Sequence, residues 1–143
     1  MLIADVNVFV YAHRPESPRH SEYRSWLGSA LTGDEPFGVA EPVLASFLRL
    51  VTSPRVYTDP TPATVALDFC RVVLTSSPAA VPVRPGIRHW TLFDSLCRSV
   101  GAAADVVPDA YLAALAIEHG ATWLTTGKTF ANFPGLRWRA PLD

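Results

Sequence analysis

The stretch that decides the fold is residues 2–10, LIADVNVFV. Its first three residues are apolar and are followed at once by Asp5, which is typical of a short buried strand that ends at an acidic residue. A helix is predicted to follow from Asn7. The chain therefore begins with a strand, a carboxylate and a helix, an order that is common in α/β proteins.

The rest of the chain repeats this order. Short apolar runs predict further strands over residues 37–39, 81–83, 121–125 and 136–139. Apolar residues at helical spacing predict helices around 23–31, 41–51, 62–73, 90–100 and 108–119. Thr61 is the predicted N-cap of the third of these helices, with Pro62 in its first turn. Such an alternation predicts an α/β fold with a mainly parallel central sheet flanked by helices.

The composition fits one globular domain over residues 1–143. Hydrophobic residues make up 49% of the chain and charged residues 17%, which excludes a disordered or highly charged protein. No run approaches the roughly 18 apolar residues of a membrane span, and the N-terminus carries an acid instead of a basic segment. We therefore expect a soluble, cytoplasmic protein that makes no membrane contact.

Several common types of site are not supported. The net charge of −1 gives no overall positive field, so any contact with nucleic acid has to be local, for example through Arg14 or Arg49. Cys70 and Cys97 lack the spacing of a metal or redox motif, and each lies in an apolar helical pattern, so they are interpreted as buried free thiols. The histidines show no zinc-binding spacing, and neither a phosphate-binding loop nor a serine-hydrolase motif occurs.

Acidic residues stand where strands give way to helices. Asp5 and Glu41 follow predicted strands, Asp109 lies in the first turn of a predicted helix, and Asp105 lies in the loop just before it. In open parallel sheets, ligand sites form outside the carboxyl ends of the strands. Each acid taken alone has a structural alternative, as a helix cap or a partner of the helix dipole.

The chain resembles the PIN-domain nucleases, and within them the VapC-type toxins. Residues 2–10 are similar to the first motif of that family, and residues 37–49 (FGVAEPVLASFLR) to its acidic second motif. Residues 107–116 (VPDAYLAALA) and 118–126 (EHGATWLTT) are similar to the third and fourth motifs. Residues 130–138 resemble the closing segment, so the resemblance covers the chain from Leu2 to Trp138.

The resemblance implies which acids form the site. It places the first three family acids at Asp5, Glu41 and Asp109, whereas the fourth position holds Gly127, which has no side chain for a metal or a water. Asp105 is a further candidate for the same cluster. Two interpretations stay open: an active ribonuclease, or a weakened or inactive PIN domain that binds RNA or antitoxin without cutting.

The resemblance also implies a cofactor and partners. Clustered carboxylates repel one another, and a site with oxygen ligands alone favours Mg²⁺ or Mn²⁺. Asp5 and Asp109 would then be the principal metal ligands, with Glu41 holding metal-bound water or accepting a proton. A divalent ion activates water and polarises a phosphodiester, which suits RNA hydrolysis. The expected partners are an RNA substrate, a cognate VapB-type antitoxin and a second copy of the chain in a homodimer.

Overall fold

The structure, a computed structural model, describes residues 1–75 and 78–142. Its centre is a five-stranded sheet in which every neighbouring pair is parallel, in the order β3-β2-β1-β4-β5. The strands are β1 (Leu2–Ala4), β2 (Phe37–Ala40), β3 (Ala80–Val83), β4 (Thr122–Leu124) and β5 (Trp138–Arg139). The predicted α/β fold is confirmed, and the sheet is wholly parallel instead of mainly so.

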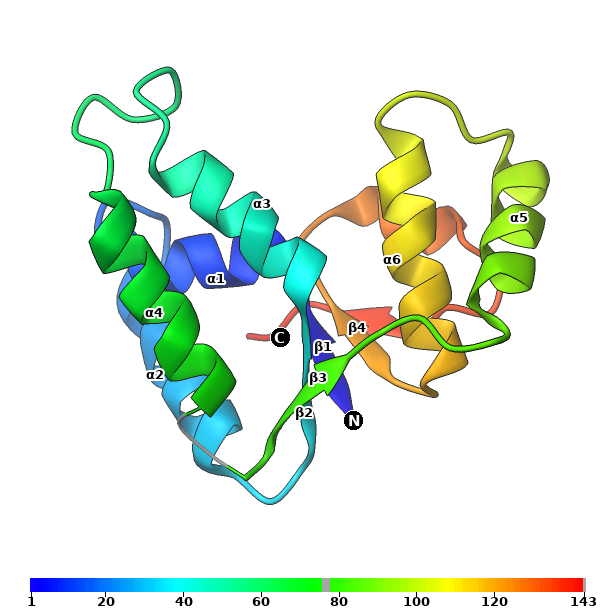
Figure 1. Cartoon of the computed structure of the whole chain (residues 1–143), viewed down its shortest axis with the longest axis horizontal. Coiled ribbons are helices and arrows are strands. Elements are labelled where there is room, and N and C mark those ends of the chain that lie inside the picture. The colour runs from blue at the N-terminus through cyan, green and yellow to red at the C-terminus, as the bar shows by residue number, and fades with distance from the viewer. Residues whose placement is uncertain (76–77, 143) are drawn as a thin grey trace.

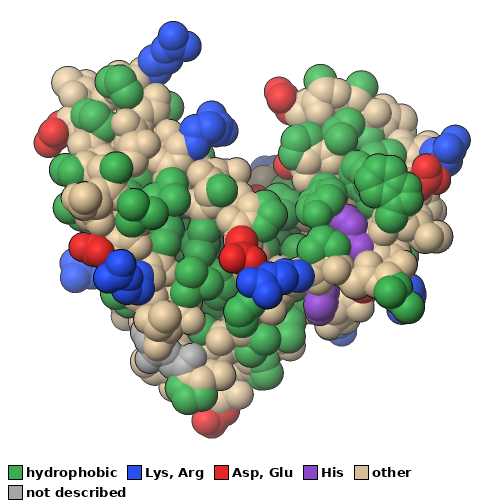
Figure 2. Space-filling view, viewed as in Figure 1, with side chains coloured by type: hydrophobic (Ala, Val, Ile, Leu, Met, Phe, Trp, Pro, Cys, Tyr) green, Lys and Arg blue, Asp and Glu red, His purple; other side chains and the backbone are tan. Residues whose placement is uncertain are grey.

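Helices connect the strands and lie on both sides of the sheet. They are α1 (Val6–His13), α2 (His20–Thr32), α3 (Glu41–Val51), α4 (Ala63–Thr75), α5 (His89–Val100) and α6 (Val106–Glu118), with the 3₁₀ helix η1 (Lys128–Asn132) before β5. Figure 1 shows α1 to α4 gathered on one side of the sheet and α5 with α6 on the other. Figure 2 shows the same two lobes in space-filling form, with a notch between them.

The core lies between the sheet and these helices. Ile3, Phe9, Phe37 and Trp123 are each 1% exposed or less, and they come from β1, α1, β2 and β4. Their burial removes large apolar surfaces from water, which is the main favourable contribution to folding. The carboxyl ends of β1 and β4 are held rigidly by this core, so residues just beyond them are well positioned.

Some element boundaries differ from the prediction. The last strand contains only Trp138 and Arg139, although residues 136–139 were predicted. The helix predicted to begin at Pro108 begins at Val106, because proline is tolerated in a first helical turn. Asp105 is therefore the N-cap residue of α6 and not a free loop residue.

One polar assignment made from sequence was wrong, and one possible nucleic-acid contact has internal partners. Thr61 does not cap α4, which begins at Ala63; its hydroxyl accepts a hydrogen bond from Arg14 Nη1 at 3.0 Å instead. Arg14, which was named as a possible RNA contact, is largely buried, donates to the Asp59 carbonyl and lies over the Tyr57 ring. Both residues fasten the loop between α3 and α4 to α1.

Cys70 and Cys97 are both free thiols as predicted, but only Cys70 is buried, and Cys97 is partly exposed. No described helix has the length and apolar character that crossing a bilayer requires.

Candidate active site

Asp5 is fixed at the carboxyl end of β1, where it caps α1. Its Oδ1 accepts a hydrogen bond from the Val6 amide at 2.7 Å, and its Oδ2 accepts one from the Thr125 hydroxyl at 2.7 Å. The residue is only 7% exposed. Burial raises the pKa of Asp5, and the bonds from Thr125 and Val6 partly oppose that rise because they stabilise the charged form.

Thr125 holds this corner of the site together. It is fully buried just after β4, which pairs with β1, so its hydroxyl reaches Asp5. The same oxygen accepts hydrogen bonds from the Gly127 amide at 3.0 Å and from Asn7 Nδ2 at 3.4 Å. Asn7 therefore contributes to the position of Asp5 through Thr125.

Thr125 belongs to the candidate site and was not among the residues predicted from sequence. The neighbouring Thr126 is exposed, while Thr125 faces the carboxylate. One signal was present, since the parallel pairing of the first and fourth strands brings the residue after each strand to the same edge. Thr125 could therefore be placed beside Asp5 only once the order of the strands in the sheet was known.

Asp109 and Asp105 approach the site from α6. Asp109 is half-buried in the first turn of that helix, and its pKa is raised first by burial, then by the negative charge of Asp5, then by that of Asp105. No cation is among the groups that shift it. Asp105 is exposed at the N-cap and makes no capping bond with its side chain. The structure therefore brings these three acids into one electrostatic environment.

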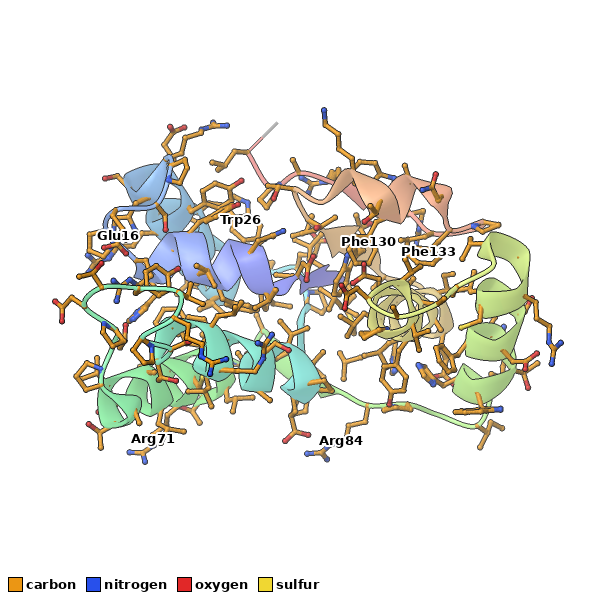
Figure 3. The ribbon with its side chains drawn as sticks, turned by 90° about the horizontal axis from the view of Figure 1, so that it is seen from above. Glu16, Trp26, Arg71, Arg84, Phe130 and Phe133 are labelled. Atoms are coloured by element: carbon orange, nitrogen blue, oxygen red, sulfur yellow. The ribbon has the colours of Figure 1, made fainter. Side chains whose placement is uncertain are left out.

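Glu41 is placed differently. It is the first residue of α3, directly after β2, and its Oε1 accepts a hydrogen bond from Arg84 Nε at 2.8 Å. This exposed ion pair lowers the pKa of Glu41, since Arg84 stabilises the carboxylate. Figure 3 shows Arg84 at the edge of the molecule, away from the N-terminus of α6. Glu41 does not contribute to the raised pKa of either Asp5 or Asp109.

Gly127 lies beside the acids without adding one. Its backbone is extended, at φ −79° and ψ 110°, so any residue type can adopt this conformation. A Cβ atom built there would lie 3.3 Å from Thr125 Oγ1, which is a tight but adjustable contact. An acidic side chain at this position would therefore start next to the hydroxyl that binds Asp5.

The donor set is one that hard divalent cations prefer. Asp5, Asp105 and Asp109 offer only carboxylate oxygens, and the negative charges of Asp5 and Asp105 both act on Asp109. Within residues 1–75 and 78–142, however, no three His, Cys, Asp or Glu side chains are grouped closely enough to enclose a metal ion. Carboxylate oxygens are nevertheless the type of ligand that hard divalent cations such as Mg²⁺ and Mn²⁺ prefer.

Comparison with known proteins gives the family. The model of the PIN domain family matches residues 2–136. Ribonuclease VapC43 of Mycobacterium tuberculosis is 47% identical to the chain over 143 residues, covering 100% of this chain and 97% of the relative. Ribonuclease VapC25 of the same organism is 39% identical over 141 residues, covering 99% of both chains.

Solved structures agree with the fold. Mycobacterium tuberculosis VapC20, described as a sarcin-ricin loop cleaving toxin, has a TM-score of 0.65 at 16% identity and covers 96% of this chain and 99% of its own. VapBC2 from Rickettsia felis, bound to a DNA fragment from its promoter, has a TM-score of 0.66 at 15% identity, covering 97% of both chains. From the family match and the close relatives, the chain belongs to the PIN domain family and, within it, to the VapC ribonucleases.

Proposed function

We propose that this protein is a metal-dependent endoribonuclease, the toxin of a VapBC-type toxin-antitoxin pair, and that it hydrolyses RNA phosphodiester bonds. The observation that supports the proposal is the placement of the two acids: Asp5 follows β1 and caps α1, and Asp109 lies in the first turn of α6, near enough for the charge of Asp5 to raise its pKa. The relatives that match the whole chain are named ribonucleases, which supports the same chemistry here.

Asp5 and Asp109 are the principal metal ligands in this proposal, with Asp105 as a third carboxylate near them. A bound Mg²⁺ or Mn²⁺ supplies Lewis acidity toward the phosphodiester and lowers the pKa of a bound water. The protein's own contribution is position: Asp5 is held by one hydrogen bond on each carboxylate oxygen, which leaves further lone pairs free to bind a cation.

Glu41 has a conditional role. We propose that it orients water or accepts a proton, and that it does so only after Arg84 releases its carboxylate. Both partners of the ion pair are more than half exposed, so solvent screens their attraction and the contact is weak. A polyanionic substrate that attracts Arg84 would free Glu41.

A second candidate function rests on Gly127. A PIN domain without the fourth acid would bind RNA or antitoxin but cut slowly or not at all. At position 127 only the backbone amide contacts Thr125 Oγ1, and glycine adds no carboxylate next to it. The loss of one acid weakens the hold on a second metal ion before it weakens the first, because Asp5 and Asp109 remain.

The test is RNA cleavage by the purified protein in Mg²⁺, in Mn²⁺ and in EDTA, beside Asp5→Ala and Gly127→Asp variants. An active nuclease cuts a pool of structured RNA with metal, loses cutting in Asp5→Ala and cuts faster in Gly127→Asp. If only Gly127→Asp cuts, the binding function is correct for the natural chain. If neither cuts although metal binds, the nuclease proposal is wrong for the RNAs in the pool.

We further propose a cytoplasmic homodimer that binds a VapB-type antitoxin. Large apolar side chains are exposed on both lobes, including Val72 on α4 and Ile87 and Trp90 around the start of α5. Figure 2 shows such apolar surface on the left and right lobes of the face in view. Exposed apolar patches of this kind are common at protein interfaces. Light scattering of the purified protein, alone and with its antitoxin, measures both assemblies.

A further inference from the structure

A pocket opens beside the acids, on the side of α6 that faces η1. It has a volume of about 340 Å³ and is bounded by the end of α5, the start of α6 and η1. The residues that line it are Ser99, Val100, Val106, Asp109, Thr129, Asn132 and Phe133. Figure 3 shows Phe133 near η1, between that segment and α5 with α6. Asp109 is therefore shared between this pocket and the acidic cluster.

The lining combines two kinds of surface. Ser99, Thr129 and Asn132 offer hydroxyl and amide groups, and these side chains make no hydrogen bond to another side chain or to the backbone of residues 1–75 and 78–142. Val100 and Phe133 supply apolar wall on the same hollow. Apart from Asp109, no lining residue carries a charge. Such a surface suits a ligand that is neutral, partly aromatic and rich in hydrogen-bonding groups.

We infer that this pocket receives a single nucleoside of the RNA chain, the one adjoining the phosphate that is cut; this rests on the proposed ribonuclease function. A nucleoside has a flat base with donors and acceptors on its edges and a ribose with a 2′-hydroxyl. The volume lies at the small end of the range for ligand pockets, about 300–1,000 Å³, so it excludes a folded RNA element.

The placement separates the two parts of a nucleotide by charge. In this arrangement the phosphate lies at the acidic cluster, where a metal held by the acids would bind it. The uncharged base and ribose enter the pocket, whose polar groups other than Asp109 are also uncharged. Because Asp109 borders both, a nucleoside in the pocket lies directly beside its own phosphate at the cluster. The pocket therefore positions the scissile bond, and its polar side chains contribute to base preference.

The experiment uses a pair of shape-conserving variants. Asn132→Leu and Thr129→Val remove hydrogen-bonding groups and keep the approximate side-chain volume, and both residues are exposed, so the fold tolerates the change. Thr64→Val on α4 is the matched control, since it is an exposed threonine outside the pocket. Each protein is titrated with AMP, GMP, CMP and UMP while backbone and side-chain amide shifts are followed by NMR, and its cleavage sites in an RNA pool are sequenced.

We expect at least one nucleotide to shift the Asn132 side-chain amide signal in the natural protein, with the affinity reduced about tenfold in Asn132→Leu and unchanged in Thr64→Val. The same pocket variant raises KM and alters the base found beside the cut, with a smaller effect on kcat. If all variants cleave RNA with the same KM and the same base preference, the pocket does not bind the nucleoside, although the ribonuclease function stands. Nucleotide binding at Asn132 without cleavage by the natural chain or by Gly127→Asp would show a nucleotide site, but it would overturn both the ribonuclease function and the assignment of the pocket to the nucleoside beside a scissile phosphate.

Discussion

Thr125 is buried, and its one hydroxyl makes hydrogen bonds to three residues. It donates to Asp5 and accepts from the amides of Gly127 and Asn7. Thr125→Val keeps the shape and removes the hydroxyl, which leaves buried polar groups without partners. We expect a loss of about 1–3 kcal/mol in the free energy of unfolding, together with a further rise in the pKa of Asp5.

Urea denaturation measures the first effect and NMR titration of the Asp5 carboxyl carbon measures the second. Thr125→Ser is the control, because it keeps the hydroxyl and loses only a methyl group. A valine variant with the same stability and the same Asp5 pKa as the natural protein would show that the hydroxyl network does not hold the site.

Arg84 acts on one candidate acid without touching the others. Arg84→Gln removes the positive charge beside Glu41, so the lowered pKa of Glu41 is expected to rise toward its ordinary value. Little stability should be lost, because exposed ion pairs contribute little. The matched control is Arg98→Gln, which breaks a similar exposed pair with Asp94. NMR titration should show the shift at Glu41 only in the first variant, and a shift in both variants would contradict the pairing.

At the scale of elements, α6 carries Asp109 and is set close to the sheet by small residues. Ala110, Ala113, Ala114 and Ala116 are all fully buried along it. Ala114→Leu forces a larger side chain into this packed face, and overpacking of this kind costs about 1–3 kcal/mol. Because the helix shifts, RNA cleavage should fall as well.

Ala63→Leu is the matched control for this helix, since Ala63 is exposed on α4. Urea denaturation and metal-dependent cleavage are measured on both variants. If Ala114→Leu is as stable and as active as the control, the close seating of α6 is not what positions Asp109.

The elements themselves were largely predictable because their periodicity is local. The apolar run before Asp5, the helical spacing after Glu41 and the glycine that ends α6 at Gly120 are all readable in short windows. The ends of the elements were harder to predict, and the N-cap predicted at Thr61 was wrong. A hydroxyl that could cap a helix can also bind side chains from elsewhere in the fold, and the Thr61 hydroxyl binds Arg14 and His13.

The site could be predicted only in part, for the same physical reason. Asp5 and Asp109 were identified from motifs and lie in one electrostatic environment. The pairing of Glu41 with Arg84 joins residues 43 positions apart and depends on the order of β2 and β3, which no local pattern contains. Thr125 and the pocket beside Asp109 likewise arise only when separate segments meet.

At the scale of the whole molecule, ionisation of Asp5 and Asp109 opposes folding of the metal-free protein, because the pKa of each carboxyl is raised in the folded state. The pKa of Asp109 is raised by burial and by Asp5 and Asp105, so its carboxylate is less favourable in the folded than in the unfolded protein. An acid with a raised pKa costs nothing below its unfolded pKa of about 3.9 and lowers stability as the pH rises through its folded value. Metal-free protein should therefore lose stability over this range.

Asp109→Asn removes that ionisation, and we expect it to make the metal-free protein more stable than the natural chain at pH 7. The difference should shrink as the pH falls below the ordinary aspartate pKa of about 3.9, where the carboxyl is protonated in both the folded and the unfolded natural protein. Added Mg²⁺ should reverse the order, since a ligand that binds only the folded state at 100 times its Kd stabilises it by about 2.7 kcal/mol, and the variant lacks a principal ligand. Urea denaturation in EDTA and in Mg²⁺ measures both effects, with Asp34→Asn as a control at an exposed acid outside the site. A natural chain that is the more stable protein in EDTA at pH 7, or that gains nothing from Mg²⁺ and Mn²⁺, would mean that Asp109 serves as a helix-dipole partner and not as a metal ligand.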